Sequence, residues 1–305
     1  MVYFPSTATI ANETDVTIGA NGLSLVLGGD VTLNHGFAGS GALRISGGEF
    51  YLRANVVFSH TGGTTLSGNI RFDMGTPKST NNAFGTGVLT IDGMSGGSPF
   101  IRFVNYAQTI TNDIVILGAA TNRTYTHQSR TVRGLVVDFN AGYISGSVTG
   151  DDDVMFGTGY GSLHVRGNVT VPKGKTIRLQ NAYVSEETPR YLEVTKTLTG
   201  NLSVEGVGLV RLTTSATCTG DVTVRNTATL EVTAAGNLAE TAVLSIPDGG
   251  KIDIASGVKV IVAELWVGGA KQANGVYRAS DLPAVISGSG SLRVGPKSGI
   301  VVWVE

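Results

Sequence analysis

Short runs in which apolar and polar residues alternate recur along the whole chain. Typical examples are residues 15–18 (Asp-Val-Thr-Ile), 42–45 (Ala-Leu-Arg-Ile), 176–179 (Thr-Ile-Arg-Leu) and 251–254 (Lys-Ile-Asp-Ile). A period of two places successive side chains on opposite faces of a β-strand, so each run has one buried and one solvated face. Roughly 25 to 30 such runs, mostly about three to five residues long, predict an all-β chain.

Glycine, asparagine and aspartate separate these runs, as in residues 19–22, 28–30, 46–48 and 96–97. All three residue types tolerate positive φ angles, which tight corners require. We therefore expect short strands joined by glycine-based corners. The segment 234–241, which contains alanine, leucine and glutamate, is the best candidate for a single helical turn.

So many short strands favour a solenoid over the other all-β architectures. A single sandwich needs far fewer strands, and the blade repeats of a propeller, about 40 to 50 residues long, do not appear. Solenoid coils of roughly 20 to 25 residues predict about a dozen turns and a rod on the order of 60 Å long. We predict an all-β, right-handed parallel β-helix (β-solenoid) that is continuous over residues 1–305, with residues 196–305 as a candidate distinct terminal section.

A Gly-x-Gly corner that leads into a strand recurs at residues 39–45, 85–91, 159–165 and 288–294. Together with the Thr-Gly-Gly-Thr sequence at 61–64, this phrase resembles the autotransporter-associated β-strand repeat. Residues 265–277, followed by 282–290, resemble the end module of large secreted repeat proteins of Gram-negative bacteria. The resemblance implies a right-handed parallel β-helix passenger, secreted or held at the bacterial cell surface. It carries no catalytic motif, so it transfers no functional residue.

Composition and charge exclude several classes of protein. Glycine, valine and threonine occupy 43, 36 and 35 of the 305 positions and disfavour helix. The formal net charge of −1 argues against a nucleic-acid partner, which would require clustered basic residues. The first residues lack the basic and apolar regions of a signal peptide, and no run of about 18 apolar residues predicts a membrane span. The single cysteine, Cys218, is expected to be a small buried apolar side chain.

Residues 151–153 are three adjacent aspartates that follow a predicted strand. Carboxylate oxygens are the ligands that Ca²⁺ prefers, but strand geometry allows at most Asp151 and Asp153 to converge. The spacing of known calcium loops is missing. We favour a solvated corner and leave open whether a groove gathers catalytic or calcium-binding carboxylates such as Asp151 and Asp153.

Other candidate groups also lack a diagnostic spacing. The four histidines show no zinc-binding pattern, His164 is expected to point outward, and the glycine-rich segment 157–161 is interpreted as a corner. A polysaccharide-active β-helix would gather acidic and basic side chains in a groove, and the candidates are Asp138, Asp151, Asp153, Lys173, Lys175 and Arg178. Tyrosines could stack on sugars, although we favour ordinary packing at the edge of the core for Tyr106, Tyr125, Tyr143, Tyr160, Tyr183 and Tyr191.

The sequence therefore predicts a non-catalytic extracellular module, structural or adhesive, that acts as a rigid spacer or a surface-binding rod. No catalytic, cofactor-binding or metal-ligating residue is assigned, and no cofactor is expected. The expected partner is a surface glycan or protein, with self-association through the solenoid ends, one of which the apolar tail 300–304 would cover. The alternative is a polysaccharide lyase or hydrolase, or a glycan-binding module, on the same scaffold.

Overall fold

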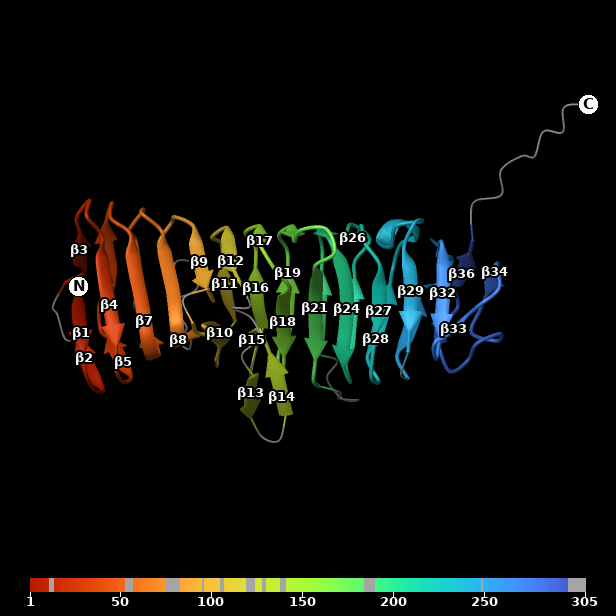
Figure 1. The fold of residues 1–305 in the computed structure, drawn as a ribbon, viewed down its shortest axis with the longest axis horizontal. Helices are drawn as coiled ribbons and strands as arrows, with labels where there is room; N and C mark the ends of the chain where they lie inside the picture. Colours follow the sequence, from red (N-terminus) through yellow and green to blue (C-terminus); the bar gives the residue numbers. More distant parts are fainter. Residues whose placement is uncertain are drawn as a thin grey trace, which may run out of the picture.

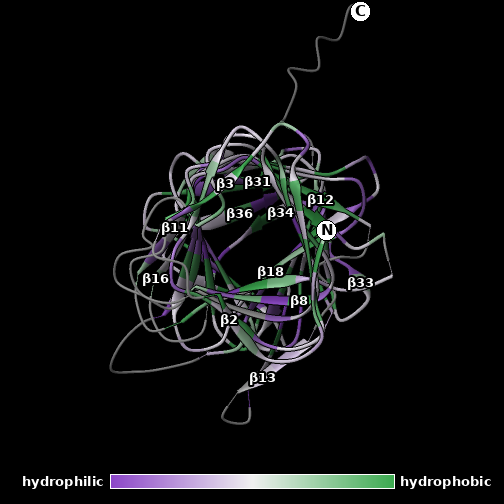
Figure 2. Ribbon diagram, turned by 90° about the vertical axis from the view of Figure 1, so that its left-hand side faces the viewer, coloured by the Kyte–Doolittle hydropathy of each residue, from purple (hydrophilic) through white to green (hydrophobic). Residues whose placement is uncertain are grey.

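The computed structural model is a rod of stacked β-coils, with the N-terminus at one end and the last described coil at the other (Figure 1). It describes residues 1–10, 14–52, 57–74, 83–94, 96–104, 107–118, 124–127, 130–137, 141–183, 190–247 and 249–295. Viewed along the axis, the coils superpose around a common core (Figure 2). Nearly every pairing between coils is parallel, so the predicted β-solenoid is confirmed.

Each coil contributes strands to three faces. Face 1 contains β1 (Val2–Phe4), β4 (Leu23–Leu27), β9 (Leu89–Asp92), β12 (Ile114–Leu117), β17 (Val148–Gly150), β20 (Val169–Thr170), β23 (Thr197–Thr199) and β26 (Thr217–Cys218). The long strands β7 (Leu43–Leu52) and β8 (Thr64–Met74) begin on this face and cross the corner onto face 2. At the C-terminal end, β31 (Lys259–Val262) pairs in parallel with β36 (Ser291–Val294).

Face 2 carries the longest unbroken stack. Eleven parallel pairings link twelve of the described strands, in agreement with about a dozen predicted turns. Besides β7 and β8 these are β2 (Ala8–Ile10), β5 (Val31–Leu33), β10 (Phe100–Phe103), β15 (Leu135–Val137), β18 (Val154–Thr158), β21 (Thr176–Asn181), β24 (Asn201–Gly206), β27 (Val222–Val224), β29 (Val243–Ile246) and β32 (Glu264–Val267).

Face 3 begins with β3 (Val16–Ile18) and β6 (Phe37–Gly39), which pair with one another. An eight-stranded sheet then continues this face. Its strands are β11 (Gln108–Ile110), β16 (Ala141–Ile144), β19 (Ser162–Val165), β22 (Tyr191–Val194), β25 (Leu209–Leu212), β28 (Thr229–Val232), β30 (Lys251–Ile254) and β35 (Ile286–Gly288).

Three antiparallel elements depart from the regular coil. The hairpin of β13 (Thr124–His127) and β14 (Arg130–Arg133) projects from the side of the rod (Figure 1). At the C-terminal end, β33 (Ala270–Lys271) pairs with β32, and β34 (Gly275–Tyr277) pairs with β36. The predicted helical turn at 234–241 is the 3₁₀ turn η2 (Ala235–Asn237), which is shorter than the predicted segment.

Equivalent inward positions of successive coils form continuous apolar columns. On face 1 one such column includes Leu198 and Cys218, and an isolated bridge adds Leu238. All three are no more than 1% exposed. Burial raises the pKa of the Cys218 thiol to about 11. Cys218 is therefore an ordinary core side chain, as the sequence predicted, and its thiol stays protonated at neutral pH.

His60 is a buried polar exception that sequence reasoning did not identify. Its Nε2 donates to the hydroxyl of Thr64, which itself donates to the carbonyl of Phe84, both at 2.9 Å. Its Nδ1 has no hydrogen-bond partner among the described residues. Burial lowers the pKa of His60 below 6.5 by more than the backbone groups of Gly63 and Phe37 raise it. The fold therefore holds a neutral imidazole.

This imidazole predicts a loss of stability in mild acid. Because its pKa is lower in the folded chain than in the unfolded chain, the unfolded chain binds more protons as the pH falls below 6.5, and the free energy of unfolding decreases. We expect thermal unfolding midpoints to fall between about pH 7.5 and 5.5. A His60→Leu variant should show a weaker pH dependence over this range, whereas His35→Leu should keep that of the parent. Equal pH dependence in all three proteins would contradict this assignment.

Candidate functional site

The three adjacent aspartates at 151–153 do not gather around one point. Asp151 accepts a hydrogen bond from the backbone amide of Gly118 at 2.6 Å. Asp152 pairs with Lys175 at 2.6 Å, and this contact lowers the pKa of Asp152. Asp153 accepts from the backbone amide of Thr176. The corner is thus bonded to neighbouring coils through three separate partners, and the described residues contain no group of three or more His, Cys, Asp or Glu arranged to hold a metal ion.

Part of the predicted acidic and basic groove does assemble on face 2. Arg178 donates to Asp153 at 3.1 Å and to Glu205 at 3.4 Å, so one guanidinium joins three successive coils. Lys175 pairs instead with Asp152, and Lys173 is exposed in the same corner, between β20 and β21. Asp138 lies outside the described residues.

The described tyrosines of the predicted row contact guanidinium groups rather than presenting open faces. Tyr160 and Tyr183 lie 4.4 and 4.1 Å from the Arg130 guanidinium, which anchors the β13–β14 hairpin. Tyr125, Tyr143 and Tyr191 are half-buried against Arg102, Arg166 and Arg211. This is the packing at the core edge that we favoured, with arginine as the partner. Tyr106 lies outside the described residues, so its role stays a prediction.

A buried charge cluster beneath this hairpin was not predicted. Asp73, 4% exposed, receives two hydrogen bonds from Arg102, at 2.5 and 3.0 Å, and an ion pair from Arg71 at 3.2 Å. Burial nevertheless raises the pKa of Asp73, against the opposing effect of Arg102 and Arg71. Arg102 also donates to the hydroxyl of Tyr125. Each member of the cluster contacts another member, so it holds the hairpin to face 2.

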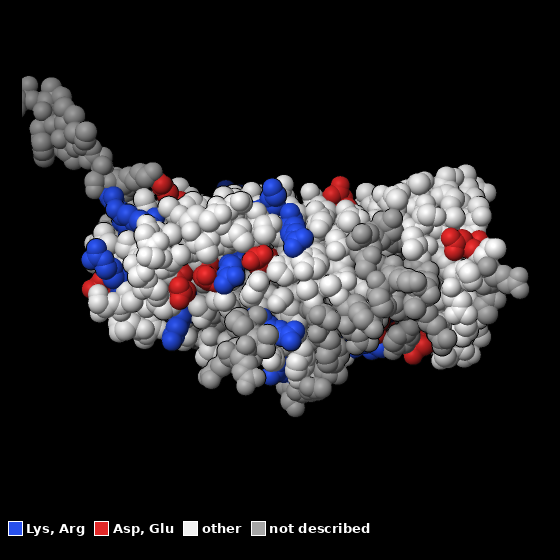
Figure 3. All heavy atoms as spheres, turned by 180° about the vertical axis from the view of Figure 1, so that it is seen from behind, with Lys and Arg blue, Asp and Glu red and all other residues white. Residues whose placement is uncertain are grey.

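Face 3 carries an outward row of charged side chains in register. His164 Nδ1 lies 3.1 Å from Glu193, and Arg211 contacts Glu193 at 4.0 Å and Glu231 at 2.6 Å. Figure 3 shows acidic and basic side chains following one another along this side of the rod. His164 points outward, as predicted, and stacks on Tyr143 with ring centres 4.8 Å apart. These side chains therefore pair with one another across successive coils of face 3.

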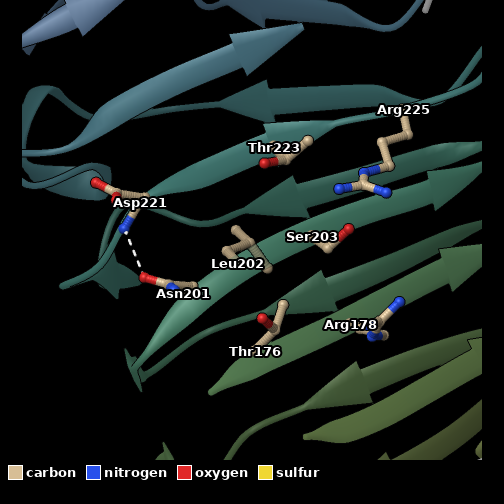
Figure 4. Close-up of a pocket in the computed structure, with 8 residues that line it drawn as sticks. All are labelled: Thr176, Arg178, Asn201, Leu202, Ser203, Asp221, Thr223 and Arg225. Carbon is tan, nitrogen blue, oxygen red and sulfur yellow. Dashed lines mark hydrogen bonds between the residues drawn. The ribbon is translucent and has the colours of Figure 1, made fainter. Parts of the chain in front are cut away.

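A polar groove lies on face 2 over β21, β24 and β27, with a volume of about 270 Å³. Parallel pairing places Arg178 beside Ser203, and Ser203 beside Thr223. Figure 4 shows Arg178 and Arg225 at one end of the groove and Asn201 and Asp221 at the other. The full lining is Thr176, Arg178, Asn201, Leu202, Ser203, Asp221, Thr223 and Arg225.

Hydrogen bonds fix part of this lining in place. Ser203, 4% exposed, donates to Glu205 at 2.8 Å, and Glu205 also accepts from Arg178. At the opposite end, the amide of Asp221 donates to Asn201 Oδ1 at 3.1 Å, and Asp221 Oδ1 accepts from the amide of Val243 at 2.8 Å. The groove therefore has a preorganised polar floor.

A second pocket continues the groove around the corner of the rod. It has a volume of about 360 Å³ and shares Asn201 and Asp221 with the first. Lys173, Thr199 and Thr219 also line it. The two pockets form one continuous surface that spans three coils and runs from face 2 onto the neighbouring corner.

Sequence reasoning found Lys173 and Arg178 in this surface but missed Asn201, Ser203, Asp221, Thr223 and Arg225. These residues come together through register: Arg178 and Ser203 are 25 positions apart, whereas Ser203 and Thr223 are 20 apart. A fixed repeat length would place residues that meet across coils at a constant spacing in the sequence. Because the coil length varies, a single sequence does not show which of them meet.

No model of a known family matches this chain, and no match was found among curated proteins or solved structures. The described residues include no helix with the length and apolar character needed to cross a membrane.

Proposed function

We propose that this protein is a non-catalytic structural or adhesive rod that presents its lateral faces to a ligand at a bacterial surface. The observation that carries the proposal is the polar groove on face 2, whose described lining contains a single carboxylate, Asp221. Hydrolysis of a glycosidic bond commonly needs two carboxyl groups in mutual reach. A continuous rod with a prearranged polar face is suited to bind a ligand or to act as a rigid spacer.

The secreted, passenger-like setting of this proposal is supported by the Gly-x-Gly and Thr-Gly-Gly-Thr phrases at 39–45 and 61–64. A polysaccharide lyase or hydrolase is the second candidate, because Asp153, Arg178 and Glu205 do assemble on the same face. The ion pairs of Arg178 with both carboxylates favour a structural role for this trio. Cell-surface location is tested by protease accessibility of the tagged protein on intact bacteria.

The purified protein should leave polysaccharides intact. We expect no new reducing ends and no absorbance of unsaturated products after prolonged incubation with neutral and acidic polysaccharides, because no free acid–base pair lines the groove. Product analysis by mass spectrometry would detect slow turnover. Turnover that is abolished by Asp153→Asn or Glu205→Gln would replace the binding function with the enzymatic one.

A further inference from the structure

The lining of the groove offers hydrogen-bond donors and acceptors in mixed order. Among the described residues, the Arg225 guanidinium has no hydrogen-bond or ion-pair partner, and it lies at one end of the groove (Figure 4). At the other end, Asn201 and Asp221 use their Oδ1 atoms in the bonds given above, and among the described residues the Asn201 amide nitrogen and Asp221 Oδ2 have no hydrogen-bond partner. The hydroxyls of Thr176 and Thr223 lie between the ends.

The lining carries charges of both signs. Arg178 is already paired with Asp153 and Glu205, so the guanidinium of Arg225 at one end and the carboxylate of Asp221 at the other are the charges left for a ligand. An anionic ligand filling the groove would meet Asp221, and a cationic ligand would meet Arg225. A ligand whose groups each donate and accept satisfies both ends, and alcohol hydroxyls have this property.

The dimensions favour a chain of several units. Asp221 and Arg225 are four residues apart along an extended segment, which corresponds to about 13 Å at the rise of a strand. The adjoining pocket lengthens the surface around the corner as far as Lys173. A ligand with hydroxyl groups at both ends of this span is longer than one sugar ring.

We propose that the groove over β21, β24 and β27 binds a neutral oligosaccharide through its hydroxyl groups, with Asn201 and Asp221 at one end and Arg225 at the other. This inference rests on the proposed function, a module that holds a surface ligand without transforming it. The lining contains no aromatic ring. We therefore expect a modest affinity, with Kd on the order of 0.1–1 mM.

Isothermal titration calorimetry of the full chain with neutral hexasaccharides of glucose, xylose and mannose tests the proposal, with hexagalacturonate as an acidic comparison. At least one neutral hexasaccharide should bind, and 0.5 M salt should change its Kd less than about twofold, since no ion pair is involved. Arg225→Gln and Asp221→Asn should each weaken that binding about tenfold. Arg44→Gln, which alters an exposed arginine on face 1, is the matched control and should bind like the parent.

Three results would overturn the inference. The first is no binding of any neutral hexasaccharide at about 10 mM. The second is binding that both groove variants leave unchanged. The third is binding of hexagalacturonate alone that is lost in 0.5 M salt. None of these results contradicts the proposal of a non-catalytic rod. That proposal is contradicted only if the protein cleaves a polysaccharide. Circular dichroism of each variant confirms that the coils are intact.

Discussion

Replacing Gly167 with alanine should destabilise the rod severely. A Cβ atom at this buried corner would lie 1.8 Å from the carbonyl oxygen of Gly146 in the preceding coil. The obstacle is backbone, and coils stack only about 4.8 Å apart, so no side-chain movement relieves the clash. Gly146 is similarly confined, because its own Cβ would lie 1.9 Å from the carbonyl oxygen of Asn112. We expect a loss of at least about 3 kcal/mol in the free energy of unfolding.

Chemical denaturation and hydrogen exchange would measure this loss. Because each coil contacts only its neighbours, exchange protection should fall first in the coils on either side of Gly167. Gly236→Ala is the matched control, since a Cβ there has no atom within 4 Å and the φ angle is not positive. That variant should be as stable as the parent or more stable by about 0.5 kcal/mol. Equal stability of Gly167→Ala and Gly236→Ala would show that the close approach of neighbouring corners does not exclude a Cβ atom at position 167.

Replacing Asn237 with alanine is the second change with a large expected effect. The fully buried side chain accepts hydrogen bonds from the amides of Thr233 and Ala234, at 2.9 and 2.8 Å. It donates to the carbonyls of Thr213 and Ala216 in the preceding coil, at 2.7 and 2.6 Å. Alanine leaves four backbone groups without these partners, and we expect a cost of about 3–5 kcal/mol.

Thermal and chemical unfolding of Asn237→Ala should be compared with Asn168→Ala. Asn168 is exposed and accepts one hydrogen bond, from the amide of Thr197 at 3.3 Å. Its removal should cost no more than about 1 kcal/mol. If the two variants unfold at the same denaturant concentration, the four bonds of Asn237 do not hold the corner.

Asn237 also shows why sequence reasoning interpreted the corners only in part. Asparagine was expected there because it tolerates positive φ, and many corner glycines, such as Gly47 and Gly249, do have positive φ. Among the described non-glycine residues only Asn226 does. Buried asparagines instead join neighbouring turns through their side chains: Asn112 donates to the carbonyls of Gly85 and Gly87. Such bonds join residues more than 20 positions apart and leave no local pattern.

The residues of the candidate site could also be predicted only in part. Lys173, Asp153 and Arg178 could be named from their position beside predicted strands, but Glu205, the second partner of Arg178, could not. Asp153 and Glu205 reach it from the coils on either side, 25 and 27 positions away. Of the charged residues that sequence reasoning grouped, Asp153 and Arg178 meet in the structure, and residues it did not consider complete the groove.

The sequence by itself determined the all-β solenoid, because the alternation of apolar and polar residues within each run decides which side chains face the core. The order of strands and corners also follows from local sequence, because alternating runs form the strands and glycine, asparagine and aspartate separate them. Only the tertiary structure decided which residues meet across coils. On face 2 the sequence separation of paired residues varies from 34 positions, for Arg102 and Val136, to 19, for Val31 and Phe50. Core columns require only that apolar residues face inward, so insertions at corners change the sequence separation of the residues that meet on the outer face without disturbing the core.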